Sequence, residues 1–221
     1  MTAIAVILVS KQIAVAADTR ETSSDGAVSL PVSKIFAEKD AFFTMTGLRN
    51  CGDVAFDADT FARAACRLGG TLKRRCEQFA ISVRQPLLEA VQHILRTRPH
   101  DFETDLRSRV ALGVLFFGFV SGRLEVAGVL FKADETNGLV SLAVETAGEA
   151  RRDFILLDAP GDIREEFQSG MSELEVRQDP VGVARKFIEF AADKSPGQVG
   201  RPIEVIRITR DGANWIQRLP G

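Results

Sequence analysis

Three residues near the beginning of the chain have the side chains that an amide-cleaving nucleophile needs. Thr2 directly follows Met1, Asp18 ends the run AVAAD and Lys34 lies in PVSKIF, at equal steps along the chain. A threonine freed by methionine removal has a hydroxyl nucleophile, and its α-amine, with an ordinary pKa near ~8, can act as the general base. A nearby lysine lowers the pKa of the hydroxyl, and an aspartate orients and compensates the lysine. The spacing suits a folded sheet better than one helix.

Composition indicates an ordinary globular protein. The chain has 221 residues, 45% hydrophobic and 26% charged, so we expect one soluble domain over residues 1–221. The formal net charge of -2 argues against a nucleic-acid or anionic-membrane partner. No run reaches the length of a membrane-spanning helix, and the apolar start is short and lacks a basic leading region. These features predict a cytoplasmic protein without a membrane partner.

The cysteines and histidines do not form a metal-binding pattern. Three cysteines, an odd number, lie in segments predicted to be helical, and only two histidines could join them. This pattern favours reduced thiols that pack in the core over a disulfide framework. No pair has the short spacing of zinc ligands, so we expect neither a metal nor another cofactor. The residues concerned are Cys51, Cys66, Cys76, His93 and His100.

The elements predicted from hydrophobic periodicity and turn residues are clustered strands and paired helices, in the order ββββ-αα-ββββ-αα-ββ. Thr71 is expected to cap the second helix, and Pro86 to kink or restart it. The order predicts an α+β fold, a four-layer αββα sandwich of two packed antiparallel sheets flanked by helices. The strands expected after the helices are 110–120, 124–131, 139–145 and 154–157, followed by helices at 163–169 and 181–193 and a final hairpin.

Several segments resemble proteasome β-type subunits, including their simpler bacterial relatives. They are TAIAVILVSKQIAVAADTRET, VSKIF, TGLRNCGD and the closing stretch GRPIEVIRITRDG, so the resemblance is strongest over residues 2–53 and 200–213. It implies an N-terminal nucleophile hydrolase with the four-layer sandwich. In such an enzyme Thr2 attacks an amide carbonyl and forms an acyl-enzyme ester. Asp18 and Lys34 match the family's catalytic aspartate and lysine.

The same resemblance assigns further residues to the site. Gly47 matches the glycine whose backbone N–H forms the oxyanion hole, and Thr22 the position whose backbone pairs with substrate as an added strand. Arg20 matches an arginine with a structural role. The family's supporting serine has no counterpart in the comparable stretch 157–162. The positions that match the lining of the specificity pocket are Glu21, Met45 and Arg49.

This resemblance therefore implies a threonine-type peptidase subunit of a proteasome-like homo-oligomeric ring. Its substrate would be a peptide or an unfolded protein, and an ATPase unfoldase is a candidate partner. One alternative is an N-terminal nucleophile amidase that acts on a small amide. Another is a catalytically silent assembly subunit that keeps the fold and retains Met1. Taken singly, Met45 is consistent with core packing and Arg49 with the start of a helix, and a lone Lys34 is more often an exposed strand-edge lysine.

Overall fold

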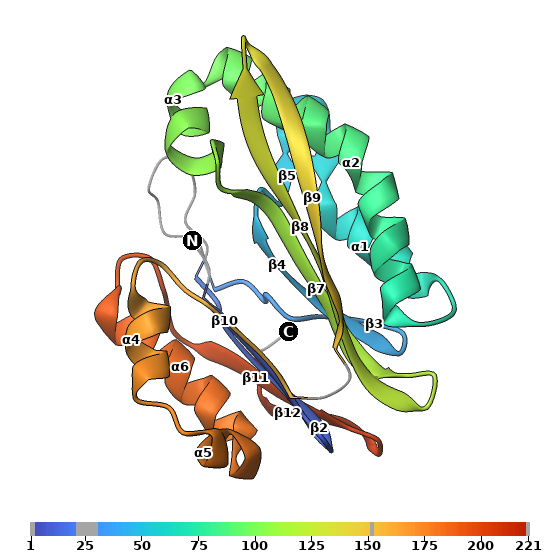
Figure 1. Cartoon of the computed structure of the whole chain (residues 1–221), viewed down its shortest axis with the longest axis vertical. Helices are drawn as coiled ribbons and strands as arrows, with labels where there is room; N and C mark the ends of the chain where they lie inside the picture. Colours follow the sequence, from blue (N-terminus) through green and yellow to red (C-terminus); the bar gives the residue numbers. More distant parts are fainter. Residues whose placement is uncertain (1–2, 21–30, 151–152, 220–221) are drawn as a thin grey trace. The chain divides into compact units, whose positions relative to one another are not determined.

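The computed structural model describes residues 3–20, 31–150 and 153–219, and these form an α+β protein with two large antiparallel sheets (Figure 1). They are grouped into two compact units. The first unit consists of Met1–Phe36, Gly122–Leu124 and Ala150–Gly221, and the second of Ala37–Ser121 and Glu125–Glu149. Each unit contains one five-stranded sheet, or nearly all of it, together with its own helices.

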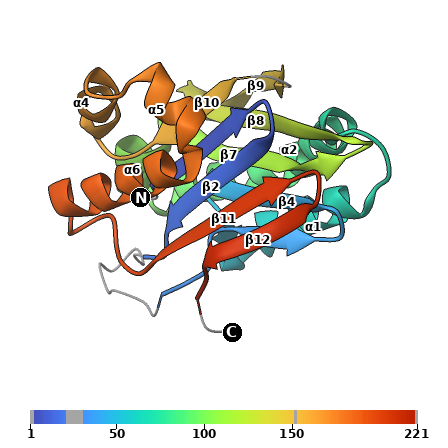
Figure 2. The same ribbon diagram turned by 90° about the horizontal axis from the view of Figure 1, so that it is seen from below.

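The sheet of the first unit has the strand order β10-β1-β2-β11-β12, and all of its pairings are antiparallel. Figure 2 shows β2, β11 and β12 side by side. The predicted first hairpin is confirmed, and every residue of β1 is buried. The predicted final hairpin, formed by β11 and β12, is also confirmed. The strands are β1 (Ile4–Val9), β2 (Gln12–Asp18), β10 (Phe154–Asp158), β11 (Ile203–Thr209) and β12 (Gly212–Gln217).

Helices α4 (Ile163–Ser169), α5 (Glu173–Gln178) and α6 (Pro180–Lys194) lie on one side of this sheet (Figure 1). The longest, α6, packs against β1, β2 and β11. Its buried face includes Phe187 and shares a core cluster with small strand residues such as Ala14 and Ala16, which allow the helix to lie close to the sheet. The short helix α5 was not predicted from the sequence.

The sheet of the second unit has the order β3-β4-β7-β8-β9. Its two predicted hairpin turns are confirmed. Ser121 and Gly122 join β7 to β8 with positive φ angles of 53° and 82°, and Asn137 and Gly138 join β8 to β9 with 55° and 78°. Such pairs of positive φ angles match the twist of antiparallel strands. The strands are β3 (Phe36–Glu38), β4 (Ala41–Gly47), β7 (Val110–Val120), β8 (Arg123–Thr136) and β9 (Leu139–Ala150).

Helices α1 (Ala58–Arg67) and α2 (Leu72–Thr97) accompany this second sheet. The predicted cap of α2 is confirmed, because the Thr71 hydroxyl accepts a hydrogen bond from the Arg74 amide at 3.3 Å. The predicted restart at Pro86 is wrong: α2 continues through it without interruption. Buried residues on both sides of the proline, including Val83 and Leu87, hold the two halves against the core and offset the lost backbone hydrogen bond.

Short elements complete the second unit, and its three cysteines are buried and free of disulfides. Burial raises the pKa of Cys66 and of Cys76 to about 12, so both thiols stay protonated at neutral pH. The expectation that these cysteines are reduced core residues agrees with this burial. The short elements are β5 (Asn50–Cys51), η1 (Gly52–Val54), β6 (Phe56–Asp57), α3 (Pro99–Asp101) and the π-helical turn η2 (Phe102–Leu106).

Candidate active site

Asp18, the last residue of β2, is fully buried and accepts four hydrogen bonds. Its Oδ1 accepts from the Lys34 ammonium and from the Ala3 amide, each at 2.8 Å. Its Oδ2 accepts from the amides of Arg20 at 3.1 Å and Gly200 at 3.3 Å. A carboxylate can be buried at this position because every contact is a donor and one of them carries a positive charge.

The Lys34 side chain is 5% exposed and forms a buried ion pair with Asp18. Lys34 lies in an irregular segment before β3, so it is not an exposed strand-edge lysine. Two of the three residues that the sequence selected for chemistry are therefore in direct contact. Thr2, the third, lies outside the described residues, as do Glu21 and Thr22.

The backbone of Ala3 is bonded to Asp18 in both directions. The Ala3 amide donates to the Asp18 carboxylate, and the Asp18 amide donates to the Ala3 carbonyl oxygen at 3.1 Å. Since Ala3 is fully buried, the peptide nitrogen that links it to the preceding residue is fixed against the carboxylate. The ion pair therefore lies beside the point where the chain enters β1.

Gly200 was not identified from the sequence as a site residue, although it begins one of the resembling segments. A Cβ at this position would lie 2.4 Å from the Cβ of Arg20 and 3.0 Å from its Cδ. The Arg20 guanidinium also donates to the Pro196 carbonyl oxygen. A glycine is needed here because the Arg20 side chain crosses the backbone just where the Gly200 amide reaches Asp18.

Substituting Gly200 with alanine is expected to lower the free energy of unfolding by about 1–3 kcal/mol, because the new methyl group must displace Arg20. Urea denaturation of the purified variant measures this change. Gly197→Ala is the matched control, since a Cβ at Gly197 meets no atom within 4 Å. Equal losses in the two variants would contradict the close approach at Gly200.

Glu204, the second residue of β11, is a second buried carboxylate near Lys34 that sequence reasoning missed. Its Oε2 accepts from the Ser33 hydroxyl at 2.8 Å and from the amides of Lys34 at 3.0 Å and Ile35 at 3.4 Å. Its Oε1 is buried and has no hydrogen-bond partner among the described residues. The available signal was an acidic residue inside the apolar run IEVIRIT, since acids are rarely buried without a role.

Gly47, Met45 and Arg49 belong to the second unit. Gly47 ends β4 with φ of 85°, and a Cβ there would lie 2.5 Å from the Ala111 carbonyl oxygen, so only glycine fits. The side chain of Met45 is enclosed, with 2% of the residue exposed, which is the arrangement of a core residue. Arg49 binds both carboxylate oxygens of Asp59, at 2.7 and 3.3 Å.

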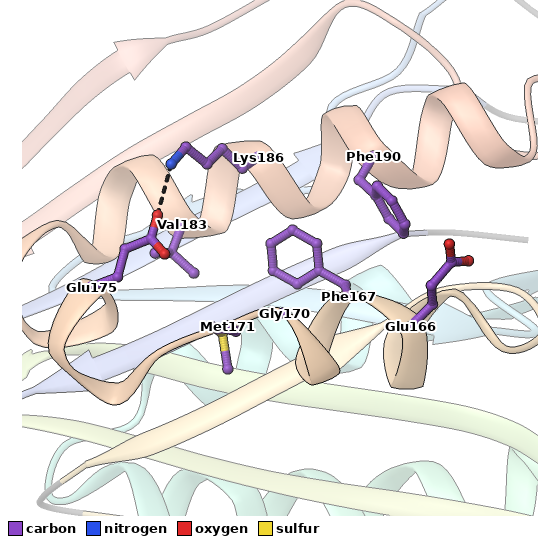
Figure 3. A pocket seen from close by; sticks show the side chains of 8 residues that line it. All are labelled: Glu166, Phe167, Gly170, Met171, Glu175, Val183, Lys186 and Phe190. Carbon is purple, nitrogen blue, oxygen red and sulfur yellow. Dashed lines mark hydrogen bonds and ion pairs between the residues drawn. The ribbon is translucent and has the colours of Figure 1, made fainter.

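The first unit also has a groove of about 360 Å³ between α4, α5 and α6 (Figure 3). Its apolar lining includes Phe167 and Phe190, and an ion pair of 2.7 Å joins Glu175 to Lys186 at its edge. Its lining includes none of the residues predicted for the site and has no serine, threonine or cysteine side chain. We therefore place the candidate chemistry at Asp18 and Lys34.

Comparison with known proteins finds no matching family model and no significant match among curated proteins. Across residues 3–20, 31–150 and 153–219, no three histidine, cysteine or acidic side chains are grouped so that they could hold a metal ion. The helices in the same ranges include none that is long and apolar enough to cross a bilayer.

Proposed function

We propose that this chain is a threonine-type peptidase subunit of a proteasome-like assembly, with Thr2 as the nucleophile after removal of Met1. One observation carries the proposal: the buried Asp18 carboxylate binds the Lys34 ammonium and the Ala3 amide through the same oxygen. The two sheets would pack face to face as the inner layers of a four-layer sandwich. Copies of the chain would form a closed ring in the cytoplasm, which confines hydrolysis to peptides and unfolded proteins.

Covalent geometry supports Thr2 as the partner of this ion pair. The two hydrogen bonds to Asp18 Oδ1 keep the Lys34 ammonium within about 6 Å of the Ala3 nitrogen. Thr2 is bonded to that nitrogen, and consecutive Cα atoms are about 3.8 Å apart. In the proposed enzyme its hydroxyl would lie beside the ammonium, whose positive charge would stabilise a threonine alkoxide.

In the proposed reaction the Thr2 α-amine accepts the hydroxyl proton while Oγ1 attacks the substrate carbonyl carbon. The Gly47 N–H donates to the oxyanion of the tetrahedral intermediate. The C–N bond then breaks, and the departing amine takes the proton from the α-ammonium group. Water hydrolyses the remaining ester and regenerates the free hydroxyl and amine. Lys34 stabilises the developing negative charge, and Asp18 holds the ammonium in place.

Substrate binding extends the same proposal. An extended peptide would pair with the backbone at Thr22 as an added strand, and one of its side chains would enter a pocket lined by Glu21 and Arg49. The Arg49–Asp59 ion pair would make the charge of that pocket depend on how the pair rearranges around the substrate. An ATPase unfoldase would supply unfolded chains to the ring.

The proposal is tested by the intact mass of the protein before and after incubation with a peptide epoxyketone, which reacts with a hydroxyl and a free α-amine on one residue. We expect loss of the Met1 mass and a single adduct, and no adduct on Thr2→Ala. A mass that retains Met1 without an adduct would contradict the proposed enzyme and favour the silent assembly subunit. Size-exclusion chromatography that gives only a monomer or dimer would contradict the ring.

A further inference from the structure

The segment that carries Lys34 has an unusual means of support. Residues 33–35 lie outside the strands, between the end of β2 and the start of β3. Just before them, the Val32 amide donates to the Thr19 carbonyl oxygen at 2.8 Å. Beyond Ser33, the amides of Lys34 and Ile35 both donate to the side chain of Glu204. One carboxylate oxygen thus accepts the backbone hydrogen bonds that the carbonyl groups of a neighbouring strand accept elsewhere in the sheet.

The register of β2 and β11 places Glu204 and Asp18 on opposite faces of the sheet. Ala17 is paired with Glu204 and Asp18 with Ile203, and paired residues share a face while successive residues alternate. Lys34 is therefore held twice. Glu204 binds its backbone amide from one face, and Asp18, which projects from the other, binds its ammonium. With both ends of the residue fixed, the ammonium has little freedom to move away from its position beside Ala3.

Stability alone does not account for an acid at this position. Glu204 is fully buried between Ile203 and Val205 on a strand that is otherwise largely apolar, and its Oε1 has no hydrogen-bond partner within the described ranges. Replacing a buried charge with a well-packed apolar residue is often neutral or stabilising. The carboxylate instead accepts hydrogen bonds from three successive residues, Ser33, Lys34 and Ile35, and so fixes this segment of the chain.

We propose that Glu204 is a positioning residue that fixes the backbone of Ser33–Ile35 so that the Lys34 ammonium is held at the nucleophile. The inference rests on the proposed function, because it assigns to Glu204 an effect on the reactivity of Thr2. Glu204 does not contact the reacting atoms in this scheme. It acts on the reaction only through Lys34.

A double-mutant cycle on the full-length protein tests this route. The variants are Glu204→Gln, Lys34→Met and their combination, and the readout is the rate of epoxyketone adduct formation on Thr2. Glutamine keeps the size of the side chain and one acceptor oxygen, so the fold is retained. We expect Glu204→Gln to slow the reaction about tenfold and Glu204→Val about a hundredfold, the effect of a displacement of about 1 Å in a catalytic group. The loss should appear in the limiting rate of adduct formation at saturating epoxyketone, with the concentration that gives half of that rate little changed.

The expected signature is non-additivity: in the Lys34→Met background, Glu204→Gln should slow the reaction no further. A merely structural role would slow both backgrounds equally and would overturn the inference. Glu189→Gln is the control, since Glu189 forms an exposed ion pair with Arg185 on α6. It should leave the rate unchanged in both backgrounds.

Failure of the proposed function is distinguishable from failure of this inference. A wild-type protein that forms no adduct contradicts the proposed function itself. The hydrogen bonds from the Lys34 and Ile35 amides to Glu204 are then tested by amide hydrogen exchange. Exchange at both amides should accelerate in Glu204→Val and stay unchanged in Glu189→Gln. Unchanged exchange at both amides in Glu204→Val would overturn the inference whether or not the protein is an enzyme.

Discussion

Replacing Asp18 with alanine is expected to lower the free energy of unfolding by about 3–5 kcal/mol, the usual loss when one partner of a buried ion pair is removed. The substitution removes the acceptor of four hydrogen bonds at once. It removes the carboxylate that binds the Lys34 ammonium and that accepts from the amides of Ala3, Arg20 and Gly200. These donors come from four separate segments, so the entry to β1, the end of β2 and the approach to β11 should loosen together.

Urea denaturation followed by circular dichroism measures this loss for Asp18→Ala. Asp193→Ala is the matched control in the same unit, because Asp193 forms an ion pair with Arg201 at a similar distance but is 67% exposed. Exposed pairs contribute only about 0–1 kcal/mol. A destabilisation of Asp18→Ala no greater than that of Asp193→Ala would show that the buried carboxylate does not organise the first unit.

Replacing Lys34 with methionine is expected to slow acylation of Thr2 by about a hundred- to a thousandfold, the loss that follows removal of one charge-stabilising donor in acyl transfer. Methionine is similar in length to lysine and fills the same volume without a charge. Asp18 keeps three amide donors in this variant, so the protein should stay folded and lose less stability than Asp18→Ala. We therefore expect Lys34→Met to lower activity strongly and to lower stability less than Asp18→Ala does.

The rate of epoxyketone adduct formation, compared at equal protein concentration, measures the effect of Lys34→Met. Lys186→Met is the control, because Lys186 also pairs with a carboxylate but its side chain is 63% exposed, on α6. We expect Lys186→Met to react at the wild-type rate. Wild-type reactivity in Lys34→Met would contradict a role for the ammonium in activating Thr2.

Local signals in the sequence were sufficient for most of the fold. Apolar runs such as AVAAD predicted the strands, and Ser-Gly and Asn-Gly pairs predicted the hairpins, because strand and turn preferences act over a few residues. The α+β class followed from the order of these elements. The restart expected at Pro86 was wrong because the local cost of proline is offset by burial of the residues around it, which sequence windows do not register.

The candidate site was likewise only partly predictable from local signals in the sequence. Asp18 and Lys34 could be selected because their residue types and spacing fit one chemistry, and the structure brings them to 2.8 Å. Gly200 and Glu204 could not be selected in this way, because each acts on residues about 170 to 180 positions earlier through a register that only the folded sheet defines. An acid in an apolar strand was a signal, but nothing local indicated that it binds the segment of Lys34.

The long separation between Asp18 and Gly200 also has a consequence for protein synthesis. A ribosome releases the amino-terminal strands early, and folding of a growing chain proceeds from that end. The contacts from Gly200 and Glu204 that complete the surroundings of Asp18 and Lys34 form only after residue 204 has been translated and has left the ribosome. Until then the Asp18–Lys34 ion pair of a nascent chain lacks these contacts.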